Sequence, residues 1–149
     1  MRTDHQQRIL LDYLGYLRDL LCLSDWALRL SDENPEEDTT LGMIEPLTGR
    51  KVAYIYLKDD FCDMSIEDQT HTLVHELIHL HHISATDIVR IDVEKVISRT
   101  AHHLLWGSFM RQMEYCVDGL ADAFSRLVKE IDYTEKSKES SETTNDNQA

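Results

Sequence analysis

The chain has few basic side chains. Its 149 residues hold 15 Lys and Arg against 28 Asp and Glu, which gives a formal net charge of -13 at pH 7. A charge of this sign repels nucleic-acid phosphates and anionic lipid surfaces, so we expect neither nucleic acid nor a membrane among the partners. The same charge favours solubility, and an acidic rim suits a basic peptide partner.

Cysteine is equally scarce. Cys22, Cys62 and Cys116 are an odd number at wide spacings, which indicates reduced thiols rather than a disulfide framework. No segment is apolar for long enough to span a bilayer, and the first residues lack the apolar core of a signal peptide. We therefore expect a cytoplasmic protein, and nothing in the sequence predicts its oligomeric state.

Apolar residues make up 42% of the chain, which at this length suffices for one globular domain with a single core. We assign that domain to residues 1–133. From Thr134 to Ala149 the sequence is polar and has no apolar face to bury, so we expect a disordered tail there. The sequence shows no internal repeat.

The first half of the domain predicts a helix followed by strands. Thr3 and Gln6 can form a capping box, and the helical spacing of the apolar residues that follow predicts a helix to about Cys22. Alternation predicts a short strand over 26–30. Two further extended runs, 41–46 and 51–57, flank a turn and indicate a hairpin.

The second half predicts helices. Ser65 is a suitable cap for the helix that contains the motif described next. The apolar spacing loosens over 83–86 and resumes as an amphipathic helix over 93–104. We expect a break or bend at Gly107 and Ser108, followed by a last helix over 110–131. Strands followed by helices predict an α+β fold.

The most informative pattern is HExxH, formed by His75, Glu76 and His79. Residues four apart share one face of a helix, so both imidazoles can reach one tetrahedral metal ion at about 2.0–2.1 Å. The carboxylate of Glu76 then flanks the metal and can accept a proton from a water whose pKa the metal has lowered to about 7. The pattern predicts a hydrolytic zinc site.

The pattern also has a plainer interpretation, because the chain holds 8 histidines and HExxH arises by chance in roughly a few per cent of such chains. The helix context favours a metal. A broad arc of apolar residues faces a stripe of histidines at positions 71, 75, 79 and 82. Buried imidazoles need hydrogen-bond acceptors or a metal, since an unsatisfied polar group inside a protein costs about 1–3 kcal/mol. Core histidines satisfied by backbone or carboxylates are the alternative.

A catalytic zinc site needs a third protein ligand and an open position. Glu114, followed four residues later by Asp118, fits a glutamate ligand with a carboxylate that hydrogen-bonds a ligating imidazole. His82 is the first rival ligand and Glu94 the second. His71 is a further rival, although a third histidine from the same helix would crowd the open side of the metal.

These features together resemble the zincin metallopeptidases of the gluzincin branch. The small size is most similar to the minigluzincins, compact catalytic domains also found in phages and mobile elements and related to proteases that cleave phage-type repressors. The resemblance spans about 26–127. It implies a small zincin-like domain in which an antiparallel sheet of about three strands packs on the HExxH helix. It also implies one Zn²⁺ per chain, peptide hydrolysis, and an edge strand that holds a peptide or protein substrate in extended conformation.

One element of the gluzincin pattern has no clear counterpart here. Tyr115, His102 and His103 are the nearby candidates for the group that stabilises the oxyanion, a donor whose removal typically costs about 3–4 kcal/mol. The first hypothesis is therefore a cytoplasmic zinc endopeptidase, acting in host cytoplasm if a phage encodes it. The alternative is a catalytically silent zinc-fold protein that inhibits a host or cellular partner through its acidic surface. A purely structural zinc site is a third hypothesis, which we rank lower because it assigns no role to Glu76 beside the metal ligands.

Overall fold

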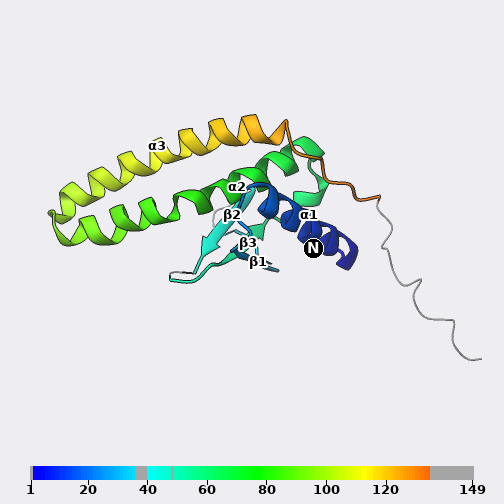
Figure 1. Ribbon diagram of the computed structural model, residues 1–149, viewed down its shortest axis with the longest axis horizontal. Coiled ribbons are helices and arrows are strands. Elements are labelled where there is room, and N and C mark those ends of the chain that lie inside the picture. The colour runs from blue at the N-terminus through cyan, green and yellow to red at the C-terminus, as the bar shows by residue number, and fades with distance from the viewer. Residues whose placement is uncertain (1, 36–39, 48, 135–149) are drawn as a thin grey trace, which may run out of the picture.

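The computed structural model describes residues 2–35, 40–47 and 49–134. They form three α-helices, three strands and short 3-10 and π-helical turns, so the α+β prediction is confirmed (Figure 1). The elements in chain order are α1 (Asp4–Leu20), β1 (Ala27–Leu30), β2 (Gly42–Pro46), β3 (Val52–Leu57), η1 (Phe61–Asp63), α2 (Ile66–Asp87), η2 (Ile88–Asp92), η3 (Val93–Lys95) and α3 (Arg99–Ser125). The expected tail lies outside the described residues, apart from Thr134.

The three strands form a mixed sheet of order β1-β3-β2. β2 and β3 are antiparallel, as the hairpin signal predicted, but β1 pairs in parallel with β3. The expectation of an antiparallel sheet was therefore wrong for one of the two pairings. The chain reverses between β1 and β2 and again between β2 and β3, so β3 runs in the direction of β1 and inserts between the two earlier strands. β2 is left as an edge strand.

The central strand β3 alternates strictly between the two faces of the sheet. Ala53, Ile55 and Leu57 are fully buried, while Tyr54 and Tyr56 lie on the opposite face and are partly exposed. This is the period-two pattern of a sheet that is covered on one side. The buried face contacts α1 and α2, which form the second layer (Figure 1).

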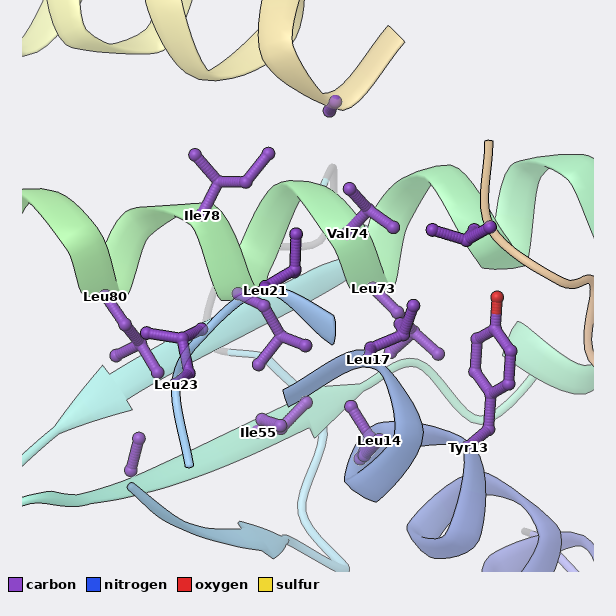
Figure 2. Packing of buried hydrophobic residues seen from close by; sticks show 14 of the residues in the cluster. Tyr13, Leu14, Leu17, Leu21, Leu23, Ile55, Leu73, Val74, Ile78 and Leu80 are labelled. Carbon is purple, nitrogen blue, oxygen red and sulfur yellow. The ribbon is translucent and has the colours of Figure 1, made fainter. Parts of the chain in front are cut away.

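Helix α2 is the centre of the molecule. Its N-cap is Ser65, as predicted, whose hydroxyl accepts a hydrogen bond from the Asp68 N–H at 3.1 Å. Figure 2 shows that Val74 and Ile78 point from α2 toward α3, whereas Leu73 and Leu80 point toward the sheet and α1. A helix with apolar residues on both sides must pack between two layers, and this packing fixes its rotation about its own axis.

Helix α3 lies on the far side of α2 from the sheet (Figure 1). It continues through Gly107 and Ser108, so the expected break there was wrong, as was the expected last helix reaching residue 131. A single glycine costs a helix only about 1 kcal/mol relative to alanine, which does not by itself end a helix of 27 residues. The weak apolar spacing over 83–86 also lies within a continuous helix, α2.

The segment after α3 returns along α1 and the start of α2. The hydroxyl of Tyr13 donates to the carbonyl of Lys129 at 2.6 Å, and the hydroxyl of Tyr133 donates to the buried side-chain oxygen of Gln69 at 2.6 Å. Val128 and Ile131 are buried against the same core. These contacts tie both ends of the domain together.

None of the helices in the described residues has the length and apolar character needed to cross a membrane. All three cysteines are free thiols in the structure, as the sequence predicted.

Candidate metal centre

Helix α2 places the two motif histidines on one face, one turn apart. The Nε2 atoms of His75 and His79 lie 3.1 Å from each other. The buried neighbours Val74, Leu77 and Ile78 hold the helix against α3 and the sheet, so the face that carries both rings is fixed by packing. Both side chains are partly exposed, which leaves the pair open to solvent and to a ligand.

Helix α3 brings the third group. Glu114 Oε2 lies 3.5 Å from His75 Nε2 and 3.7 Å from His79 Nε2. Three atoms that bind one tetrahedral zinc ion at about 2.1 Å stand about 3.4 Å from one another. The observed triangle of two imidazole nitrogens and one carboxylate oxygen matches this spacing. His75, His79 and Glu114 can therefore hold a metal ion.

Asp118 lies one helical turn after Glu114 and contacts the other nitrogen of the first histidine. Its Oδ1 is 3.0 Å from His75 Nδ1. A proton on Nδ1 that donates to this carboxylate leaves the lone pair of Nε2 free to point into the triangle. Such a partner fixes both the tautomer and the orientation of a ligating imidazole.

Glu76 occupies a different environment from the ligand candidates. Its side chain is 8% exposed, and the backbone N–H of Ile44 on β2 is its hydrogen-bond partner. Burial, opposed by this hydrogen bond and assisted by the charge of Glu114, raises the pKa of the Glu76 carboxyl to about 8. A nearby cation would favour the ionised form of the same carboxyl.

The approach of β2 to α2 depends on Gly42. A Cβ atom at this position would lie 2.9 Å from Thr72 Cγ2, 3.2 Å from Leu57 Cδ2 and 3.5 Å from Glu76 Cγ. Only glycine lets the strand come this close to the helix. That closeness brings the backbone of β2 beside the Glu76 side chain.

The imidazole of His79 lies among other histidines. Burial, together with the neighbouring His75 and His82, lowers the pKa of His79 to about 4. The imidazole of His79 is therefore neutral at pH 7. A metal ion binds only the neutral form, so no proton has to be displaced from this ring.

The triangle opens into a cleft of about 670 Å³ between β2, α2 and α3. Gly42, Met43, Ile44 and Pro46 form its β2 wall, and Met110 lies on the α3 side. A second hollow of about 660 Å³ continues past Met43 and Met110 toward the two tryptophans, Trp26 and Trp106. At this volume the cleft has room for more than a single side chain.

The rival ligands are not members of the triangle. The His71 imidazole lies 3.1 Å from Asp122, and Glu94 is exposed on η3. His82 Nε2 is buried and has no hydrogen-bond partner among the described residues. The group that the structure brings together within those residues is His75, His79 and Glu114.

The candidates for an oxyanion donor lie away from the lining of the cleft. Tyr115 is 64% exposed, His103 is exposed, and the His102 Nε2 lies 2.9 Å from the Val89 carbonyl. The sequence analysis missed Gly42 and Ile44, which shape the cleft and contact Glu76. A glycine at the start of a predicted strand was the available signal, since glycine in a strand often marks close approach of another element.

Comparison of the chain with models of protein families, with curated proteins and with solved structures finds no match.

Proposed function

We propose that the protein is a zinc-dependent metalloendopeptidase, a hydrolase of the gluzincin type. The observation that carries this proposal is the triangle of His75 Nε2, His79 Nε2 and Glu114 Oε2, with the buried carboxyl of Glu76 beside it. Two imidazoles and one carboxylate form the donor set of catalytic zinc sites, which keep a fourth position open. A structural site normally has four protein ligands.

In this proposal the residues of the site have three roles, which are metal binding, orientation of a ligand and proton transfer. His75, His79 and Glu114 hold the ion, and Asp118 orients the ring of His75. A bound zinc ion polarises the peptide carbonyl and a water molecule and makes that water more acidic. Glu76 accepts the proton of the water as it attacks the carbonyl carbon, and then delivers this proton to the leaving amide nitrogen as the C–N bond breaks.

The edge strand β2 supports a peptide as the substrate. Leu47 hydrogen-bonds to Val52 of β3 and Leu41 to Lys58 directly after β3, so the alternation of an antiparallel pair directs the backbone groups of Gly42, Ile44 and Pro46 away from β3. The Ile44 N–H already bonds to Glu76 and proline has no N–H, so the carbonyls of these residues and the Gly42 N–H are the groups that a peptide could meet. These residues also line the cleft. An extended peptide that pairs with this edge would pass in front of the metal triangle.

Elemental analysis and a peptide library read by mass spectrometry test the proposal together. We expect one zinc per chain and cleavage products that disappear on chelation. Glu76→Gln should retain zinc and lower hydrolysis by about 10²–10⁴-fold, because the amide cannot accept a proton. Glu94→Gln, a change of the same chemistry at an exposed site, should cleave normally. A zinc-loaded protein with no cleavage of any peptide would contradict the proposal.

A silent zinc-fold protein that binds and inhibits a partner through its acidic surface is the second candidate. The observation that favours it is the lining of the cleft, whose described residues include no Tyr or Arg, and no His besides the two ligand candidates. Under this alternative, Glu76→Gln retains the full biological effect in a cell-based assay. Loss of that effect favours the peptidase.

A further inference from the structure

The hollow that continues the metal cleft gathers basic side chains. Arg50, Lys51 and Arg90 line it, together with Trp26 and Trp106. The whole chain holds 15 Lys and Arg against 28 Asp and Glu, whereas basic residues outnumber acidic ones in this lining. The connection between β2 and β3 supplies Arg50 and Lys51, and η2 supplies Arg90.

The acidic residues of this lining, Glu45 and Asp87, both have partners. The Glu45 carboxylate accepts a hydrogen bond from the Tyr56 hydroxyl at 3.0 Å, on the face of the sheet that points away from α2. Asp87 Oδ1 lies 2.8 Å from Arg90 Nη2. An ion pair between exposed groups is weak, and a guanidinium has five N–H donors, so Arg90 can still bind a second carboxylate.

Arg50 and Lys51 differ in how far they are already engaged. The Arg50 side chain is exposed and has no hydrogen bond or ion pair with any residue that the structure describes. Lys51 Nζ lies 3.2 Å from Asp25 Oδ2 and 4.8 Å from the centre of the Trp26 ring. The Lys51 side chain is 58% exposed, so its ammonium keeps donors for a ligand. A carboxylate that enters the hollow therefore meets three cations with donors to spare.

The hollow and the metal cleft form one groove along the edge strand β2. The residues that line both are Met43, Ile44, Pro46, Ile83, Thr86 and Met110. In Figure 1 the turn between β2 and β3 and the end of α2 extend toward the same side of the molecule. From Ile44, which donates to Glu76, to Leu47, three residues of extended strand span about 10 Å. The cations therefore lie to one side of the metal triangle, which lines only the first of the two hollows.

We propose that this end of the groove is a subsite for acidic side chains, so that the enzyme selects peptides with Asp or Glu about three or four residues from the cleaved bond, on one side of it only. The inference rests on the proposed function, because it names the substrates of the same metal centre. A cleft lined by charge of one sign attracts ligands of the other sign. Arginine also binds a carboxylate through two parallel N–H donors, which favours Asp and Glu over neutral residues.

The charge of the whole chain acts on every part of a peptide alike. The formal net charge of -13 weakens the binding of any acidic peptide, but charges more than about 8 Å away are largely screened at physiological ionic strength. The cations of the hollow lie against a bound side chain, so they decide which residue is preferred there. High salt should reduce this preference, because it screens exposed ion pairs.

Cleavage of a random peptide library by the zinc-loaded full-length protein tests the position of the subsite. We expect Asp and Glu to be enriched on one side of the cleaved bonds, about three or four residues away, and this enrichment to fall at high salt. Arg50→Glu should abolish or reverse the enrichment. Arg29→Glu is the matched control, because Arg29 is exposed on β1 on the same face of the sheet as Tyr54, and it should leave the enrichment unchanged.

A binding measurement separates this inference from the proposed function. Zinc-loaded Glu76→Gln is titrated with a fluorescein-labelled peptide of Ala and Glu, and with the same peptide in which Gln replaces Glu. We expect fluorescence anisotropy to give a Kd roughly fivefold to tenfold lower for the Glu peptide, and Arg50→Glu in the same background should remove the difference. If circular dichroism shows that Arg50→Glu does not fold, Arg90→Gln replaces it and should reduce the difference roughly threefold.

The two measurements distinguish failure of the subsite from failure of the peptidase. Cleaved peptides without one-sided acidic enrichment, equal affinities for the two labelled peptides, or a preference that survives both Arg50→Glu and Arg90→Gln would overturn the inference and leave the proposed function in place. Preferential binding of the Glu peptide without cleavage of any peptide would support the subsite and contradict the proposed function.

Discussion

The stability of the metal-free protein should depend on pH through Glu76. This carboxyl is nearly fully buried, and its pKa rises from 4.5 to about 8 in the folded protein. In the unfolded chain it ionises near the ordinary value. Between these two pKa values the folded state holds a proton on Glu76 that the unfolded state has lost, so the contribution of Glu76 to the free energy of unfolding falls as pH rises. The stabilisation is complete below about pH 4.5 and is lost above about pH 8.

The size of the effect follows from the pKa difference. Each pH unit between the two values contributes about 1.4 kcal/mol. At pH 7, 2.5 units above 4.5, the contribution of Glu76 to the stability has therefore fallen by roughly 3 kcal/mol relative to acid. The lowered pKa of His79 acts in the opposite direction, and this second effect cancels when the wild type is compared with Glu76→Gln. Glu76→Gln removes the titrating group while its amide oxygen can still accept the Ile44 N–H. As the pH is raised from 4.5 to 7, the free energy of unfolding of the variant minus that of the wild type should therefore increase by this amount.

Urea denaturation of chelator-treated protein at several pH values measures this difference. The matched control is Glu94→Gln, an exposed substitution whose difference from the wild type should not change with pH. Zinc should flatten the wild-type profile, since a cation beside Glu76 favours its ionised form. A constant difference between Glu76→Gln and wild type over this pH range would refute the assignment of Glu76 as a buried, protonated carboxyl.

Four further outcomes are expected. Glu114→Ala should weaken zinc binding far more than Glu94→Ala in a chelator competition, and equal affinities would contradict the ligand assignment. Asp118→Ala should cost about 10–100-fold in zinc affinity or in turnover, as loss of a partner to a ligating imidazole does. Gly42→Ala places a methyl group as close as 2.9 Å to a side chain of α2, so it should lower turnover while zinc content persists. Tyr133→Phe leaves a buried amide oxygen without its 2.6 Å hydrogen bond and should lower the free energy of unfolding by about 1–3 kcal/mol in urea.

The parts of the site that could be predicted from sequence are those set by helical spacing. His75 and His79 are one turn apart on α2, and Glu114 and Asp118 are one turn apart on α3, so each pair shares a face before any tertiary contact forms. The apolar residues of both helices then indicate which sides pack together. For that reason the sequence could nominate the four side chains that the structure brings together.

Non-local pairing could not be predicted in the same way. The hairpin of β2 and β3 has a local turn signal, but the parallel pairing of β1 with β3 joins segments separated by β2. The continuity of α3 through Gly107 was missed as well, because a glycine followed by a serine inside a helical pattern is also compatible with a bend. The contact of Glu76 with the Ile44 backbone likewise arises only when β2 lies against α2.

The burial of Glu76 raises the question of why position 76 holds a glutamate and not an uncharged glutamine. The side chain accepts one backbone hydrogen bond, and the oxygen of a glutamine could accept the same bond without an ionisable group in the core. A site with only a structural role would gain stability from that exchange at neutral pH. The carboxyl therefore lowers the free energy of unfolding at neutral pH. Such a loss is common at the catalytic groups of enzymes, and it agrees with the proposal that Glu76 accepts and releases a proton beside the metal triangle. If Glu76→Gln proves both more stable and unable to hydrolyse any peptide, the two measurements together identify Glu76 as the group selected for catalysis.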